Sequence, residues 1–202
     1  EIAYEKAGII KQGRPVVMYP QLGEVSSVIR KVSEDREATL YEVSADQISV
    51  KETSLEGNSL DFRYKDREYK DLKLNLIGNH QFLNAATALT AVEAVRDLGV
   101  TISQDAIYHG LSKTRWPGRL EKVYENPYII IDGAHNASGA SALAHTVSQY
   151  FAKEKVTLVL GILNDKEVDP VISRICPLAH TIIVTRPDNP RAMEPSQLSS
   201  KA

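Results

Sequence analysis

Apolar residues recur with two different periods along this chain, and the changes of period mark its predicted elements. Between residues 46 and 76 they alternate with polar residues, as at Leu60, Phe62 and Tyr64, which predicts antiparallel strands with one solvated face. After Gly78–Gln81 they recur at helical spacing up to Leu98, and Gly99 ends this predicted helix. Its buried side is predicted to comprise Phe82, Ala85, Ala86, Leu89, Val92 and Val95. The earlier residues predict a helix over 1–8, a strand over 15–19, a helix over 24–33 and a strand over 38–43.

The segment Trp116–Arg119 is the predicted domain boundary, because its proline and glycine cannot continue the helix that begins at the capping residue Ser103. Beyond it, apolar runs predict strands over 129–131, 156–160 and 181–185, with helices between them, the second over 168–175. This alternation is typical of a parallel sheet with right-handed crossovers. We therefore expect an α/β protein with domains at 1–115 and 116–202. Three strands are few for a doubly wound domain, so we expect the chain to be a fragment.

The run Ile129–Ile131 and the polar turn Asp132–Asn136 form the first candidate for a functional turn. Three β-branched residues predict a strand buried on both faces, and a helix is expected after the turn. In open α/β sheets, ligands bind beyond the carboxyl ends of strands, near helix N-termini. The carboxylate, imidazole and amide of this turn could order an anion, a sugar hydroxyl or a base. The alternative is that Asp132 and Asn136 only form the turn and cap the helix.

Three polar clusters follow the three predicted strands of the second domain, and parallel strands would place them along one sheet edge. The clusters are Asp132/His135/Asn136, Asn164/Asp165/Lys166 and Arg186/Asp188/Asn189/Arg191. Such an edge suits a substrate that carries phosphate together with amine or carboxylate groups. Arg119 could supply a guanidinium for phosphate, or be a solvated linker residue. Asn79, His80 and Asn84, in the first turns of the long helix, are either caps or further binding groups.

Composition narrows the classes of function. The 202 residues are 43% hydrophobic and 25% charged, which is ordinary for a globular protein. The net charge of −2 gives no bulk attraction to nucleic acid or anionic lipid, and no apolar run reaches membrane-spanning length. Cys176, the single cysteine, excludes an internal disulfide and a multi-cysteine metal site. The sequence also lacks a Gly-x-x-x-x-Gly-Lys-Ser/Thr phosphate loop, a Gly-x-Gly-x-x-Gly fingerprint and a Gly-x-Ser-x-Gly elbow.

Six short motifs, taken in order, resemble the folylpolyglutamate synthase/dihydrofolate synthase family, part of the Mur ligase superfamily. They are Ile2–Lys11, Gly78–Gln81 with Asn84–Ala85, Pro117–Glu121, Asp132–Asn136, Asp165–Lys166, and Thr185–Pro187 with Pro190–Ala192. The resemblance implies that residues 1–115 are the tail of a Mur-ligase-type central ATPase domain. It implies that 116–202 are most of a Rossmann-like C-terminal domain with a mainly parallel sheet. The phosphate loop and folate-binding loops would lie upstream, so the fragment alone is expected to be inactive.

The resemblance implies an ATP-dependent ligase that adds L-glutamate to a folate. ATP would phosphorylate the terminal carboxylate of the folate, and the amino group of glutamate would attack the resulting acyl phosphate. Magnesium would be required and mostly held by upstream residues. A dihydrofolate synthase or a bifunctional enzyme stays open within the family, and a non-catalytic nucleotide-binding module is the alternative from another class. We expect a cytoplasmic monomer whose partners are these small molecules, with no nucleic acid and no membrane.

The resemblance also implies roles for individual residues. Lys6 matches a lysine that is carbamylated in the family, which would offer two oxygens to a metal ion and demands a desolvated amine. Asp132 and His135 match a strand-end pair important for ATP and catalysis, and replacing either by alanine is expected to abolish turnover with little loss of fold. The residues implied in nucleotide binding are Asn79, His80, Asn84, Arg119, Asp132 and His135. Asn136, Asp165, Lys166 and Arg191 fall within family motifs; where the family often has Asp-Lys-Asp, this chain has Glu167 as the third residue.

Overall fold

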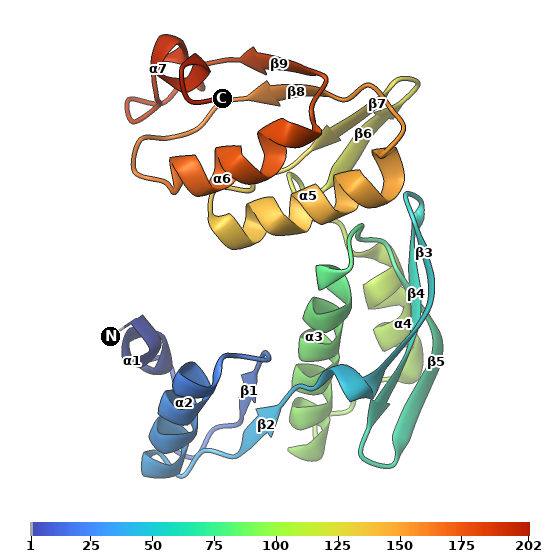
Figure 1. The fold of residues 1–202 in the computed structure, drawn as a ribbon. Coiled ribbons are helices and arrows are strands. Elements are labelled where there is room, and N and C mark those ends of the chain that lie inside the picture. The colour runs from blue at the N-terminus through green and yellow to red at the C-terminus, as the bar shows by residue number, and fades with distance from the viewer. Residues whose placement is uncertain (1) are drawn as a thin grey trace. The chain divides into compact units, whose positions relative to one another are not determined.

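The structure, a computed structural model, describes residues 2–202, which divide into two compact units (Figure 1). The first unit comprises the residues up to Asn75 together with His80–Arg115. The second comprises Trp116–Ala202 together with the short segment Leu76–Asn79. None of the helices in this described range has both the length and the apolar character needed to cross a membrane.

The first unit begins with two short helix–strand pairs, as the sequence predicts for residues 2–43. Helices α1 (Ile2–Ala7) and α2 (Gly23–Asp35) pack against each other. Strand β1 (Val16–Met18) pairs in parallel with β2 (Leu40–Glu42). A single 3-10 turn, η1 (Ala45–Gln47), then leads into the next sheet.

An antiparallel sheet of three strands follows, which confirms the prediction from the alternating pattern. The strands are β3 (Ile48–Ser54), β4 (Gly57–Tyr64) and β5 (Arg67–Leu74). Leu60, Phe62 and Leu72 are almost fully buried on its inner side. Helix α3 (His80–Asp97) packs against β3 and β4, and α4 (Gln104–Lys113) packs against β5. The predicted cap of α4 is confirmed, since the Ser103 side chain accepts a hydrogen bond from the Ala106 N–H at 3.1 Å.

The predicted buried side of α3 is correct at its start and wrong at its end. Phe82 is buried, but Val95 is 37% exposed. Because a helix turns once every 3.6 residues, the buried strip that starts at Phe82 reaches Glu93 and Ala94 instead. The buried Glu93 carboxylate accepts hydrogen bonds from Tyr69, Arg67 and Arg96, and so ties α3 to β5.

The second unit holds four strands in two hydrogen-bonded pairs. Its strands are β6 (Glu121–Glu125), β7 (Tyr128–Ile131), β8 (Thr157–Leu160) and β9 (Thr181–Val184). Its helices are α5 (Ala137–Phe151), α6 (Val168–Ile175) and α7 (Pro195–Ser199), with a 3-10 turn η2 (Cys176–Leu178). Strands β8 and β9 are parallel, as predicted. Strand β7 instead pairs in antiparallel fashion with β6, and within residues 2–202 no ladder joins β7 to β8.

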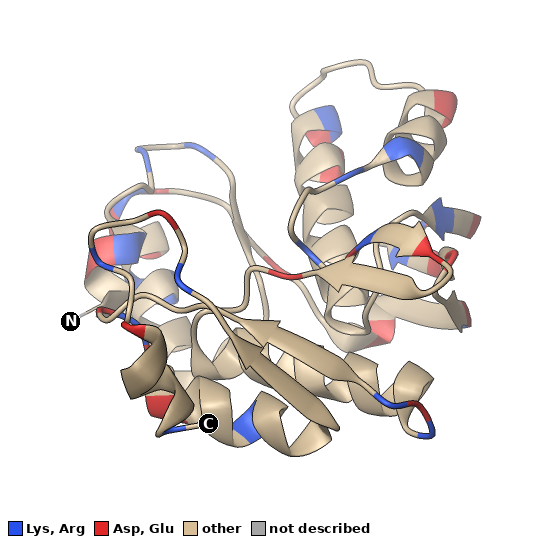
Figure 2. Cartoon of the chain, turned by 90° about the horizontal axis from the view of Figure 1, so that it is seen from above, with Lys and Arg blue, Asp and Glu red and all other residues tan. Residues whose placement is uncertain are grey.

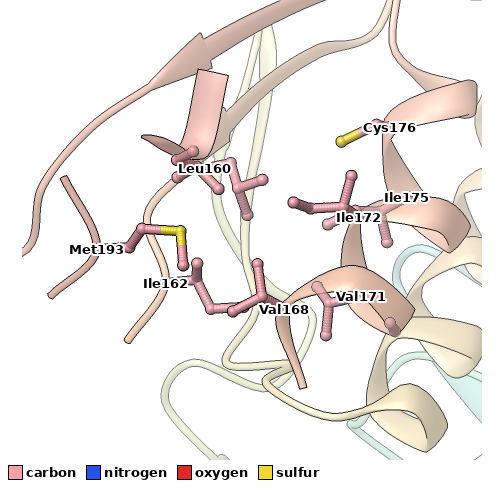
Figure 3. Close-up of a cluster of buried hydrophobic side chains, with 10 residues drawn as sticks. Leu160, Ile162, Val168, Val171, Ile172, Ile175, Cys176 and Met193 are labelled. Carbon is pink, nitrogen blue, oxygen red and sulfur yellow. The ribbon is translucent and has the colours of Figure 1, made fainter. Parts of the chain in front are cut away.

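The core of the second unit lies between the strands and helices α5 and α6, which cover the same side of the strands (Figure 1). Leu160, Val171, Ile172 and Met193 pack together there (Figure 3). The prediction that the strand Ile129–Ile131 is buried on both faces is wrong for the described chain, because Ile129 and Ile131 are each about half exposed.

Candidate active site

The turn after β7 is fastened to the segment that precedes β6. One carboxylate oxygen of Asp132 accepts a hydrogen bond from the Leu120 N–H at 2.9 Å, and the other accepts one from the Ala134 N–H at 2.8 Å. The Gly133 N–H donates to the Gly118 carbonyl at 2.8 Å. Both carboxylate oxygens of Asp132 therefore accept hydrogen bonds from backbone amides, so the replacement of Asp132 by alanine is expected to loosen the turn. Replacement by alanine should therefore disturb the fold less at the exposed His135 than at Asp132.

Arg119 lies against this turn. A Cβ atom built on Gly133 would be 3.3 Å from Nη1 of Arg119 and 3.3 Å from the Gly118 carbonyl oxygen. The guanidinium therefore passes over the one residue of the turn that has no side chain. Arg119 makes no ion pair with any described residue, which leaves its charge available for an anionic ligand.

The His135 ring is oriented by its own turn. Its Nδ1 lies 2.9 Å from the Gly133 carbonyl oxygen. A carbonyl oxygen can only accept, so this contact assigns the proton of the neutral ring to Nδ1. The Nε2 atom then carries a lone pair on an exposed side chain, where it can accept a hydrogen bond or a proton.

The end of the turn is the start of α5, and two side chains cap it. The Asn136 side-chain oxygen accepts from the Gly139 N–H at 2.8 Å, which is the capping role that sequence analysis kept as the alternative for Asn136. The Glu167 carboxylate, from the loop after β8, accepts from the Ala137 N–H at 2.6 Å. In the sequence, Glu167 was noted only as a departure from the family's Asp-Lys-Asp motif, and no local pattern signals a cap from a residue so distant in sequence.

The second and third polar clusters adjoin each other beyond β8 and β9. Asp165 pairs with Arg191 at 2.7 Å, while Lys166 lies 4.0 Å from the same carboxylate. The Asn164 N–H donates to the Arg191 carbonyl at 2.8 Å. These contacts join the second and third predicted clusters, and the neighbouring Glu167 contacts Ala137, the residue that follows the turn of the first. Figure 2 shows basic and acidic positions interspersed in the loops of the chain.

The remaining predicted site residues lie on other elements. The Asn79 side-chain nitrogen is 3.0 Å from Nε2 of His145 on α5, so Asn79 joins the second unit. His80 is the first residue of α3, and the exposed Asn84 donates to the Gln81 side chain at 2.9 Å. Both belong to the first unit.

Lys6 is an exposed residue of α1 in the first unit. The described residues therefore do not supply the desolvation that a carbamylated lysine demands. Across residues 2–202, no group of three or more His, Cys, Asp or Glu side chains is arranged to hold a metal ion. These residues do not by themselves fit a magnesium site.

The α/β unit that carries this turn is similar to a domain of the Mur ligase class. Residues 118–202 match the family model of the Mur ligase glutamate ligase domain. That match covers the turn, Arg119 and all three polar clusters.

Over its whole length the chain is similar to proteins of the folylpolyglutamate synthase/dihydrofolate synthase family. It is 37% identical over 210 residues to the dihydrofolate synthase/folylpolyglutamate synthase of Bacillus subtilis, which covers 100% of this chain and 49% of that protein. The structure of Mycobacterium tuberculosis folylpolyglutamate synthase complexed with ADP is similar with a TM-score of 0.90 and 33% identity, over 100% of this chain and 46% of that one. The Thermotoga maritima folylpolyglutamate synthase gives a TM-score of 0.85 and 33% identity, over 100% and 47%.

These comparisons confirm the predicted fold class, a mixed α/β chain with parallel strand pairs. The chain spans about half the length of the relatives that it matches.

Proposed function

We propose that the complete protein containing this chain is an ATP-dependent ligase that joins L-glutamate to a folate through an acyl phosphate. One observation carries the proposal: Arg119 lies against the turn that holds Asp132 and His135, in a domain that matches the Mur ligase glutamate ligase domain. The ADP complex of the homologous Mycobacterium tuberculosis enzyme supports a nucleotide as the ligand.

The proposed reaction has two steps. A carboxylate oxygen of the folate attacks the γ-phosphorus of ATP, which forms an acyl phosphate and releases ADP. The amino group of glutamate then attacks the acyl carbon, its proton is lost, and inorganic phosphate leaves with the oxygen that the carboxylate supplied. Both steps move negative charge between oxygens, so the protein acts chiefly by positioning the reactants and neutralising charge.

Arg119 and the two turn residues Asp132 and His135 each have a distinct part in this proposal. Arg119 neutralises a phosphate of the nucleotide, because its guanidinium is always charged and lacks an ion-pair partner among residues 2–202. Asp132 keeps the turn in place through two backbone hydrogen bonds. His135 presents Nε2 as an acceptor for a proton of the incoming amine.

Residues 1–115 would then be the tail of the central ATPase domain and 116–202 the C-terminal ligase domain, as predicted. Asn79, His80 and Asn84 would contact the adenine side of ATP. Lys6 would act as a carbamate toward Mg²⁺, with the desolvation supplied by parts of the protein beyond this chain. We propose that the protein is a cytoplasmic monomer.

A coupled assay of ADP release by the complete protein tests the proposal. With ATP, Mg²⁺ and tetrahydrofolate present, we expect release to depend on added glutamate. ATP binding without glutamate-dependent release would contradict the proposal and favour a non-catalytic nucleotide-binding module. Dihydropteroate in place of the folate tests the alternative of a dihydrofolate synthase or a bifunctional enzyme.

Arg119→Ala provides the residue-level test. Loss of one preorganised charge at a developing phosphate anion typically costs about 10²–10³ in kcat, and we expect a loss of this order. The matched control is Arg115→Ala, which removes an exposed arginine four residues away in sequence. Equal activity of the two variants would contradict the role of Arg119.

A further inference from the structure

Glu167 is the last residue before α6, yet its carboxylate caps the start of a different helix, α5. Its Oε2 atom accepts a hydrogen bond from the Ala137 N–H, the first amide of α5, at 2.6 Å. A hydrogen bond from an amide to an ionised carboxylate is charge-assisted and therefore shorter than one between neutral groups. The contact joins the loop after β8 to the turn after β7, which lie thirty residues apart.

The turn that carries His135 is thus held at both ends by carboxylates. At its start, Asp132 accepts the Leu120 and Ala134 amides. At its end, Glu167 accepts the Ala137 amide. His135 lies between these two ends, and its ring is fixed only to the Gly133 carbonyl of the same turn. The ring therefore moves wherever the backbone of the turn moves.

The contact also decides what the start of α5 can bind. The first amides of a helix carry partial positive charge and often hold a phosphate. Here one of them already holds an internal anion, Glu167. A phosphate of the nucleotide is therefore left to the guanidinium of Arg119 rather than to the amide of Ala137.

We propose that Glu167 is a positioning residue that fixes the Ala137 end of the Asp132–Asn136 turn and so sets the direction of His135 Nε2. This inference rests on the proposed function, to which it adds a residue that touches neither substrate nor nucleotide. Asp165, two residues earlier, pairs with Arg191 at 2.7 Å, so the loop that carries Glu167 is itself tied to the segment after β9. Glu167 is the contact through which that anchored loop holds the turn.

The length of the side chain matters more than its charge in this proposal. Glu167→Gln keeps the reach and an acceptor oxygen, and we expect kcat within about threefold of the wild type. Glu167→Asp is shorter by one methylene and Glu167→Ala has no acceptor, and we expect each to lower kcat roughly tenfold or more, since small misplacements of catalytic groups cost that much. The KM for ATP should change less than about twofold, because Arg119 is untouched.

The experiment compares these variants in the complete protein with Asp169→Asn as the matched control. Asp169 is on α6, two residues after Glu167, and pairs with Lys201 at 2.7 Å, away from the turn. Thermal melts identify losses due to unfolding alone. An amide spectrum with ¹⁵N-labelled alanine follows the Ala137 N–H, which should move upfield in Glu167→Ala and stay in place in Asp169→Asn.

A lower kcat for Glu167→Ala and Glu167→Asp, with Glu167→Gln and Asp169→Asn near the wild type, supports the proposal. Activity of Glu167→Ala equal to that of Asp169→Asn, or an unshifted Ala137 amide, overturns it. A kcat near that of the wild type in Glu167→Asp but not in Glu167→Gln also overturns the proposal, since that result assigns the effect to negative charge at the start of α5. An inactive wild type would refute the proposed function instead, and the Ala137 amide would still decide whether Glu167 holds the turn.

Discussion

Removing the carboxylate of Glu93 should destabilise the first unit far more than removing an exposed carboxylate of the same sheet. The side chain of Glu93 is 1% exposed and accepts hydrogen bonds from Arg67, Arg96 and Tyr69. Taking away one partner of a buried ion pair typically costs about 3–5 kcal/mol. Here the two arginines are 37% and 29% exposed and can be hydrated, so we expect Glu93→Ala to cost about 3 kcal/mol, the lower end of that range.

The pKa values of this cluster predict how its contribution varies with pH. Burial raises the pKa of Glu93, but hydrogen bonds from Tyr69, Arg67 and Arg96 outweigh burial and leave the pKa below its usual range. Stability from such a carboxyl is complete above its unfolded pKa of about 4.3 and is lost as the pH falls through the lower folded value.

The alkaline side of the same cluster depends on Tyr69. Burial and the neighbouring Glu93 raise the pKa of Tyr69 to about 12. The neutral phenol therefore contributes fully below its unfolded pKa of about 10, and this contribution is lost as the pH rises toward the folded value.

Amide hydrogen exchange of β5 and α3 measures the free energy of opening of this region. The matched control is Glu68→Ala on β5, whose exposed carboxylate pairs only with Lys70 and should cost less than about 0.5 kcal/mol. A cost for Glu93→Ala as small as that of Glu68→Ala would refute the reasoning. So would an acid dependence that is unchanged in Glu93→Ala.

Three further changes have defined outcomes. Gly133→Ala places a Cβ 3.3 Å from the Gly118 carbonyl oxygen and from Arg119 Nη1, so thermal unfolding should show a loss of about 1 kcal/mol and the KM for ATP should rise. The control is Gly110→Ala in α4, whose new Cβ meets no atom within 4 Å, so this variant should stabilise the protein by about 0.5–1 kcal/mol. If Gly133→Ala also stabilised the protein, the close approach of Arg119 and Gly118 to Gly133 would be contradicted. Ser103→Ala removes the cap of α4 and should cost about 1 kcal/mol in urea unfolding, and no measurable cost would contradict the hydrogen bond to Ala106.

The elements of the first unit could be predicted because each buries one face, and burial of one face imposes a period on the sequence. The same reasoning wrongly predicted that Val95 is buried, because it considered only apolar residues and so did not identify the buried Glu93. It also passed over β6, whose residues Glu121–Glu125 are largely charged and mostly exposed. The exposure of Ile129 and Ile131 was not predictable, because a run of isoleucines specifies a strand but not what covers it.

The candidate site could be predicted as a set of residue types and not as a set of contacts. Asp132 was identified from its place after a strand, but its partner Leu120 lies twelve residues earlier and follows no periodicity. Glu167 was noted as a departure from the family motif, but its contact was not predictable, because its partner Ala137 is on another helix. The sequence did not single out Gly133 either. A side chain at this position is disfavoured only because Arg119 lies close to it in the structure.

The fate of one oxygen atom tests the proposed ligase chemistry most directly. If the folate carboxylate attacks ATP and glutamate then displaces phosphate, a folate labelled with ¹⁸O in its terminal carboxylate transfers one labelled oxygen to inorganic phosphate. We expect the complete protein to release phosphate with one ¹⁸O per amide bond formed. Unlabelled phosphate released in step with amide formation would contradict an acyl-phosphate intermediate and the function proposed for this turn.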